Sequence, residues 1–167
     1  MGEPTCTFTG HRAEKLPWGY NENDPRCRRL KRTLYDTLEA VYESGFHRFI
    51  CGMAEGCDFY FCEAILALRE EHHDITLEAA VPFAGQAEHW GAAQRQRYEA
   101  LLARCDTVTV LQEHYSPGCM MKRNRYMVDH ADLIIACYDG KSGGTLNTLR
   151  YAIERDIQIV HLPLENV

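Results

Sequence analysis

The sequence has no long hydrophobic run, no excess of basic residues and no repeated or low-complexity segment. A membrane-spanning helix needs about 20 consecutive apolar residues, and no stretch of the chain approaches that length. Lys and Arg number 18 against 24 Asp and Glu, which gives a formal net charge of −6. Affinity for a nucleic-acid backbone comes largely from Lys and Arg. We therefore expect no membrane partner, and no nucleic-acid partner for this chain on its own.

The sequence also lacks the marks of a disulfide scaffold and of a common zinc site. No secretory signal opens the chain, and Cys6, Cys51 and Cys137 lie inside apolar runs. The spacing of Cys51, Cys57 and Cys62 contains no Cys-x-x-Cys pair, which is the usual zinc pattern. The eight cysteines therefore indicate a reduced, cytoplasmic protein without a metal site.

Short β-rich runs alternate with longer amphipathic stretches from one end of the chain to the other. The predicted strands are Thr5–Thr9, Arg48–Cys51, Thr76–Val81, Thr107–Leu111, Leu133–Cys137 and Gln158–His161. The predicted helices are Arg26–Ser44, Cys57–Glu71, Gln86–Arg104, Met120–His130 and Gly144–Arg155. This alternation predicts an α/β fold. We expect a single Rossmann-like domain over residues 1–167, with a mostly parallel sheet of about six strands and helices on both faces.

Two segments keep two interpretations each. The densest basic cluster, within residues 26–32, is either an anion-binding patch or a solvated helix face. The irregular insertion at residues 13–24 is either a lid or a surface loop.

The most informative stretch follows the fifth predicted strand, where a glycine-rich turn leads into a helix. Backbone N–H groups in the first turn of a helix have no internal partners, and the helix dipole adds positive charge there. The segment therefore predicts a phosphate-binding turn made by Asp139, Ser142, Gly143, Gly144 and Thr145. The alternative is an ordinary helix start with Thr145 as its cap.

The loops after the other strands also carry residues suited to binding. In an open parallel sheet, ligands bind beyond the carboxyl ends of the strands, so these loops should converge. The first loop contributes Thr9, Gly10, His11 and Arg12, the second contributes Gly52, Glu55, Gly56 and Asp58, and the third contributes Phe83. The helix before the fifth strand adds Lys122 and Arg123, which we expect to point toward the same sheet edge.

Taken in order, three motifs resemble the YpsA-like family of the SLOG superfamily, which is named after the Smf/DprA and LOG proteins. The motifs are Thr9–Arg12, Gly52–Asp58, and Met120–Asp132 followed by Gly143–Thr145. The resemblance spans nearly the whole chain. It implies a Rossmann-like sheet and the binding of a nucleotide or a nucleotide-derived ligand.

LOG enzymes release a base from a nucleoside monophosphate, and the match to their motifs is incomplete. LOG proteins carry Met-x-x-Arg ahead of an Ala-Asp pair and then Gly-Gly-x-Gly-Thr-x-x-Glu; the matching residues are Met120, Arg123, Ala131, Asp132 and Thr145. Thr148 stands where the glutamate would be. Cleavage of an N-glycosidic bond builds positive charge on the sugar, which a carboxylate stabilises and a threonine does not.

The first hypothesis is therefore a protein that binds or senses a nucleotide derivative and requires no other cofactor. The amides of Gly143 to Thr145 would hold phosphate together with Arg123 and Arg12. Ribose would meet Glu55 or Asp58, and the base would stack on an aromatic ring of the third or fourth loop, namely Phe83, His114 or Tyr115.

Two further hypotheses stay open. The chain could be a nucleotide hydrolase that uses His11, Glu55 or Asp58 as acid or base. It could also be a module associated with DNA processing, although its acidic balance weighs against this. Apolar and aromatic residues on the helices further suggest a homodimer, with packing in the core as the alternative.

Overall fold

The computed structural model describes residues 2–141 and 143–164, and within these ranges six parallel strands form one sheet. The strands are β1 (Thr5–Gly10), β2 (Arg48–Cys51), β3 (Thr76–Val81), β4 (Thr107–Val110), β5 (Leu133–Tyr138) and β6 (Gln158–Pro163). Their order across the sheet is β4-β3-β2-β1-β5-β6. The predicted Rossmann-like α/β fold is confirmed.

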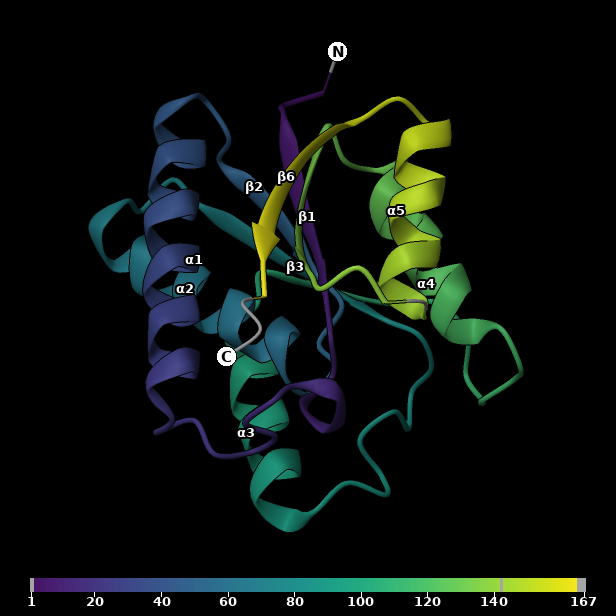
Figure 1. The fold of residues 1–167 in the computed structure, drawn as a ribbon. Coiled ribbons are helices and arrows are strands. Elements are labelled where there is room, and N and C mark those ends of the chain that lie inside the picture. The colour runs from purple at the N-terminus through teal and green to yellow at the C-terminus, as the bar shows by residue number, and fades with distance from the viewer. Residues whose placement is uncertain (1, 142, 165–167) are drawn as a thin grey trace.

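Helices cover both faces of the sheet, as Figure 1 shows. The helices α1 (Pro25–Glu43), α2 (Cys57–Glu71) and α3 (Ala92–Ala103) lie on one face, and α4 (Cys119–Asp129) and α5 (Gly144–Glu154) lie on the other. Right-handed crossovers explain this division, because β1 to β4 are added in one direction and β5 and β6 in the other. The change of direction places a switch point between β1 and β5.

The first helix follows directly from its sequence pattern. Leu30, Leu34 and Leu38 recur at a spacing of four residues, and all three are buried in the main hydrophobic core. The carboxylate of Asp24 caps the helix by accepting a hydrogen bond from the backbone N–H of Arg26 at 2.9 Å. Such a helix fixes the position of the loop that precedes it.

The insertion at residues 13–24, which we call the strap, is anchored on the core. It begins with a short 3-10 helix, η1 (Ala13–Lys15), and it buries Leu16 and Trp18. The indole N–H of Trp18 donates a hydrogen bond to the hydroxyl of Tyr60 at 3.1 Å. The strap is therefore a packed part of the fold, not a loop over the surface.

The predicted start of the third helix, at Gln86, is wrong. Helix α3 begins at Ala92, and the residues from Gly85 to His89 form turns. Gln86 is buried there, and its side-chain amide donates a hydrogen bond to the carbonyl of Met53 at 3.1 Å. A side chain that hydrogen-bonds to backbone groups can favour a non-helical conformation over the helix.

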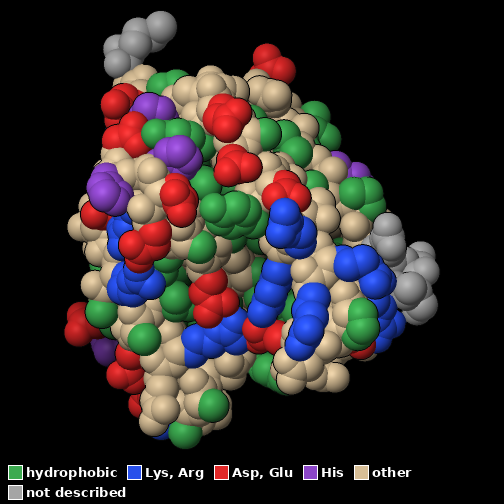
Figure 2. All heavy atoms as spheres, turned by 90° about the vertical axis from the view of Figure 1, so that its left-hand side faces the viewer, with side chains coloured by type: hydrophobic (Ala, Val, Ile, Leu, Met, Phe, Trp, Pro, Cys, Tyr) green, Lys and Arg blue, Asp and Glu red, His purple; other side chains and the backbone are tan. Residues whose placement is uncertain are grey.

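The basic cluster on α1 is a solvated helix face. Figure 2 shows Lys and Arg gathered over the lower part of the side that carries α1, with Asp and Glu among and above them. Lys31 pairs with Glu22 at 2.7 Å, and Arg32 pairs with Asp36 at 3.3 Å. Arg28 and Arg29 are exposed to solvent, so we assign no anion site to this face.

The structure bears on two expectations about partners. None of the helices in residues 2–141 and 143–164 is long and apolar enough to cross a membrane. The aromatic residues that suggested a homodimer pack against the core, namely Tyr35, Tyr42, Trp90, Tyr98 and Tyr126. The homodimer stays a prediction without a surface assigned to it.

Candidate anion-binding site

A cavity of about 130 Å³ lies at the switch point, at the carboxyl ends of the strands. The loop after β1, the start of α2, the inner face of α4 and the start of α5 all line it. From the predicted set, the lining residues are Thr9, Gly10, His11, Arg12, Asp58, Arg123, Gly144 and Thr145. The predicted convergence of separate loops therefore occurs, and the fold supplies it by pairing Gly10 with Cys137 across β1 and β5.

The first turn of α5 presents its backbone to this cavity. Gly143 is the N-cap residue and has a φ of 145°, a conformation that favours glycine. In the described part of the chain no side chain caps this helix, so the alternative interpretation of Thr145 as the cap is wrong. Gly144 and Thr145 line the cavity. The N–H groups at this helix start are therefore the groups that an anion can engage.

Arg123 places a positive charge in the same cavity. Its side chain is 4% exposed, and its guanidinium donates hydrogen bonds to the carbonyl of Gly52 and to Asn124 Oδ1, the latter at 2.8 Å. Burial lowers the pKa of Arg123 from its ordinary value, and the nearby Asp58 carboxylate acts against this shift. Arginine keeps its proton under any such shift, so the site holds a fixed cation.

Asp58 is the carboxylate that lines the cavity, and it is 8% exposed. Its Oδ2 accepts a hydrogen bond from the backbone N–H of Ala54 at 3.1 Å. Burial raises the pKa of Asp58, while the charge of Arg123 and the Ala54 hydrogen bond act in the opposite direction. Asp58 and Arg123 both lie against Gly52, because a Cβ built on that glycine would be 3.0 Å from each side chain.

His11 connects the loop after β1 to the glycine-rich turn. Its Nε2 lies 3.0 Å from Asp139 Oδ1, and the same oxygen accepts a hydrogen bond from the backbone N–H of Lys141 at 3.0 Å. Burial acts to raise the pKa of Asp139, but the hydrogen bonds from His11 and Lys141 lower it below its ordinary value. His11 lines the cavity while Asp139 stands behind it, so Asp139 positions the turn.

Gly10 and Gly56 allow two loops to pack without space between them. A Cβ on Gly56 would lie 2.5 Å from the backbone nitrogen of Ala13, and Gly56 also has a φ of +92°. A Cβ on Gly10 would lie 2.7 Å from the Cβ of Cys57. Gly56 does not line the cavity, so its role is to bring the loop of Asp58 against the loop of His11.

The other predicted residues do not line the cavity or lie outside the description. Gly52, Gly56, Asp139 and Gly143 are not among its lining residues. Glu55 lines a separate hollow, where its Oε2 accepts a hydrogen bond from the hydroxyl of Tyr20 at 2.5 Å. Phe83 contacts Tyr115 edge-on at 5.5 Å and does not line the cavity, and neither Tyr115 nor His114 does so. Ser142 lies outside the described residues.

Lys122 also points away from the cavity, contrary to the sequence-based expectation. Its Nζ donates a hydrogen bond to Gln112 Oε1 at 3.2 Å, on the outer side of α4. Neighbouring residues on a helix are about 100° apart. Lys122 is turned away from Arg123 in one direction, toward Gln112, while Asn124 is turned in the other direction and lines the cavity.

Sequence reasoning missed Lys15 and Asn124, which both line the cavity. Lys15 belongs to the strap, and its Nζ would be 3.0 Å from a Cβ on Gly143. An irregular insertion gives no periodicity that could have placed this lysine. Asn124 orients Arg123 and follows it in sequence, so its polar side chain was the available signal.

Thr148 stands at the position of the LOG glutamate, and it is fully buried. Its Oγ1 donates a hydrogen bond to the carbonyl of Gly144 at 2.8 Å, within α5. The side chain is thus turned into its own helix and does not line the cavity. Within residues 2–141 and 143–164, no group of three or more His, Cys, Asp or Glu side chains is placed to hold a metal ion.

Two solved structures share this fold over nearly the whole chain. DNA processing protein A (DprA) from Helicobacter pylori matches with a TM-score of 0.66 at 16% identity, over 99% of this chain and 67% of that chain. DprA from Streptococcus pneumoniae matches with a TM-score of 0.62 at 16% identity, over 96% of this chain and 50% of that chain. This chain therefore spans half the length of the S. pneumoniae protein, and at this identity the likeness concerns the fold.

Sequence comparisons identify the family. The SPbeta prophage-derived protein YoqJ of Bacillus subtilis (strain 168) is 34% identical over 142 residues, which cover 77% of this chain and 83% of that protein. A UPF0398 protein of Bacillus pumilus is 27% identical over 128 residues, which cover 75% of this chain and 69% of that protein. The YpsA model, described as the YspA SLOG family, matches residues 6–164. The chain therefore belongs to the YpsA family of SLOG proteins.

Proposed function

We propose that the cavity binds the phosphate group of a nucleotide or of a nucleotide-derived ligand. One observation carries this proposal: the uncapped start of α5 and the buried guanidinium of Arg123 line the same cavity at the switch point of the sheet. Helix-start amides and an arginine guanidinium are complementary to phosphate oxygens. An apolar ligand would displace water from these polar groups without replacing the lost hydrogen bonds, which is unfavourable.

Local charge supports an anion although the whole chain is acidic. Arg12 and Lys15 line the cavity beside Arg123, and among the described residues that line it Asp58 is the one carboxylate. Three cations around one small volume attract an anion, and the partly buried setting reduces screening by salt. The acidic excess of the chain is carried by residues outside the cavity.

We propose binding or sensing in preference to catalysis. The position of the LOG glutamate carries Thr148, which does not line the cavity. The alternative is a nucleotide hydrolase in which Asp58 acts, because Asp58 lines the cavity and burial raises its pKa. Release of base from nucleoside monophosphates that is abolished by Asp58→Asn would favour the hydrolase.

Nucleic acid remains an outcome to be measured. The H. pylori DprA structure is described for its single-stranded DNA binding mode, and a DNA strand also presents phosphates. We favour a small nucleotide for this chain because its acidic balance disfavours a polyanion. Eight free cysteines fit a reducing compartment, so we further propose that the protein acts in the cytoplasm.

Calorimetric titration tests the proposal with inorganic phosphate, AMP, ADP, NAD and ADP-ribose. Arg123→Gln should weaken phosphate-containing ligands at least roughly tenfold, because it removes a charged hydrogen-bond donor. Arg32→Gln is the matched control, since the Arg32 side chain is 81% exposed on α1. Arg12→Gln, at a half-buried position, provides a second variant if Arg123→Gln alters folding. The proposal is wrong if no phosphate compound binds, or if Arg123→Gln and Arg12→Gln bind as the wild type does.

A further inference from the structure

A second hollow of about 310 Å³ lies beside the cavity, and the site described above does not use it. It is lined by Arg12, Glu14, Tyr20, Glu55, His89 and Trp90, among others. Arg12 lines both the hollow and the cavity. One molecule that reaches past Arg12 can therefore occupy both spaces.

The carboxylate of Glu55 gives the hollow a fixed acceptor of hydrogen bonds. The hydroxyl of Tyr20 donates to Glu55 Oε2 at 2.5 Å, and this contact holds the half-buried carboxylate in place. An ionised carboxylate has about four acceptor positions, so one hydrogen bond leaves capacity for further donors. Vicinal hydroxyls of a ribose are donors of this kind, and acidic residues bind them in other dinucleotide-binding sheets.

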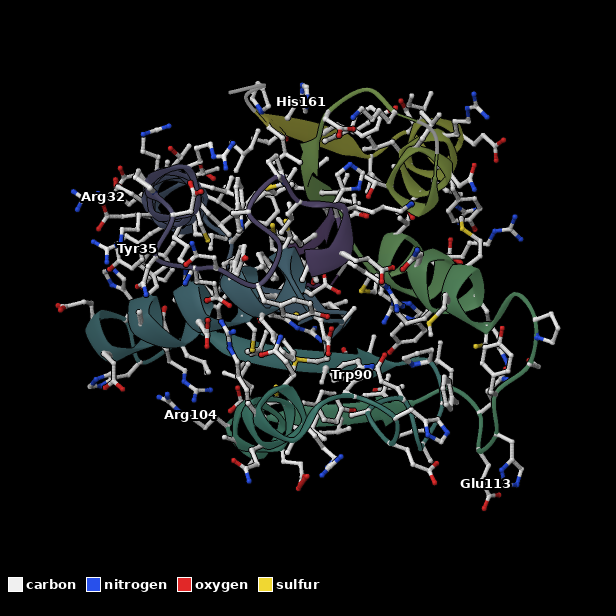
Figure 3. The ribbon with its side chains drawn as sticks, turned by 60° about the horizontal axis from the view of Figure 1, so that its bottom comes forward. Arg32, Tyr35, Trp90, Arg104, Glu113 and His161 are labelled. Atoms are coloured by element: carbon white, nitrogen blue, oxygen red, sulfur yellow. The ribbon has the colours of Figure 1, made fainter. Side chains whose placement is uncertain are left out.

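Trp90 gives the hollow a rigid aromatic surface. Its ring packs edge-on against Phe59 at 6.0 Å and against Tyr98 at 5.3 Å, while the side chain stays half-buried. Figure 3 shows the carboxyl edge of the sheet, with Trp90 near the middle of this face and Glu113 at its periphery. A base can stack on such a ring.

We propose that the second hollow binds the nucleoside part of the same ligand, a proposal that rests on the proposed function. The phosphate lies in the cavity, Arg12 spans the junction, the ribose hydroxyls donate to Glu55 and the base lies against Trp90. The ligand class is thus a nucleoside phosphate, recognised at both ends. This assignment moves the base from the loops of Phe83 and Tyr115, which lie outside both spaces.

The test compares three probes of increasing size: inorganic phosphate, ribose 5-phosphate and AMP. The wild type should bind AMP roughly tenfold more tightly than ribose 5-phosphate, the gain expected from one stacked base. Trp90→Leu should bring AMP to the affinity of ribose 5-phosphate. Glu55→Gln should weaken the binding of ribose 5-phosphate and AMP roughly tenfold but should not weaken the binding of inorganic phosphate, because only the first two carry ribose hydroxyls that reach Glu55. Glu113→Gln makes the same change of charge at the distant position and should leave all three affinities unchanged.

The outcomes separate this inference from the proposed function. If Arg123→Gln binds none of the three probes while Trp90→Leu and Glu55→Gln bind AMP as the wild type does, the phosphate site is supported and the nucleoside assignment is wrong. If the wild type binds none of the three probes, the nucleoside assignment is wrong; if ADP, NAD and ADP-ribose also fail to bind, the proposed function is wrong as well. Tyr20→Phe provides a check at an exposed position that does not threaten folding, since Tyr20 is 58% exposed. It should weaken ribose 5-phosphate and leave inorganic phosphate unchanged.

Discussion

Gly52→Ala should displace the guanidinium of Arg123 without removing its charge. A Cβ at this position would lie 3.0 Å from Cζ and Nη1 of Arg123 and 3.0 Å from Oδ2 of Asp58. Heavy atoms in ordinary contact are about 3.5–4.0 Å apart, so the neighbours must move by about 0.5 Å. The backbone of Gly52 does not require glycine, because its φ lies outside the left-handed region. The effect of the substitution therefore comes from crowding alone.

The magnitude follows from two opposing terms. Overpacking of a closely packed site destabilises the folded protein by about 1–3 kcal/mol. Replacing glycine by alanine stabilises it by about 0.4–1 kcal/mol, because alanine lowers the conformational entropy of the unfolded chain. We expect a net loss of about 1 kcal/mol in the free energy of unfolding, which lowers Tm by about 2–4 °C in a domain of this size. Loss of one charge-assisted hydrogen bond to the anion should weaken phosphate binding at least roughly tenfold.

Urea unfolding and calorimetric titration with inorganic phosphate measure these two quantities on the same preparation. Gly91→Ala is the matched control, because a Cβ there would meet no atom within 4 Å. It should leave phosphate affinity unchanged. If Gly52→Ala binds phosphate as tightly as the wild type, the placement of Arg123 beside Gly52 has no part in binding and the reasoning fails.

Three further predictions concern single side chains. Asp58→Asn should strengthen sulfate binding at pH 7, because it removes a carboxylate from the cavity. In sulfate titrations at decreasing pH, the affinity of Asp58→Asn should rise less than that of the wild type. Weaker sulfate binding by Asp58→Asn than by the wild type would contradict this prediction. Since burial raises the folded-state pKa of Asp58, the wild type should lose stability as pH rises from the unfolded value through that pKa, and Asp58→Asn should lack this loss in urea titrations. Thr148→Glu should lower the free energy of unfolding by about 3 kcal/mol or more, because Thr148 is fully buried and an ionised side chain there is costly. Thr148→Val is the uncharged control. An unfolding free energy of Thr148→Glu equal to that of the wild type would refute the buried placement. Trp18→Ala should lower the free energy of unfolding, measured in urea, by about 3–5 kcal/mol, since Trp18 anchors the strap. Tyr20→Ala in the same strap should lower it far less. Equal decreases for the two variants would mean that Trp18 does not anchor the strap.

Much of the fold could be predicted because each strand and helix has its own periodic pattern. Leu30, Leu34 and Leu38 mark one face of α1, and the apolar run from Leu133 marks a strand buried on both faces. The start of α3 could not be read in this way, since Gln86 is held by a hydrogen bond to Met53 from a distant loop. Propensity acts locally, and such tertiary contacts override it.

The candidate site was predictable where it depends on topology. Parallel strands bring their carboxyl ends to one edge, so Gly10, Arg123 and Gly144 could be expected together from the sequence alone. The direction of individual side chains could not be foreseen. Glu55 and Asp58 belong to one loop, yet Asp58 faces the cavity and Glu55 faces the second hollow. Which carboxylate faces which space depends on how Gly56 packs against the neighbouring loop.

The central claim is that backbone N–H groups at the start of α5 hold a phosphate group together with Arg123. The most direct measurement is the change in amide chemical shifts when inorganic phosphate and AMP are titrated into the isotopically labelled protein. The amides of Gly144 and Thr145 should shift most and saturate together with the Nε–H of Arg123. The account is contradicted if these three signals stay in place while those of α1, with its exposed basic face, follow the added phosphate.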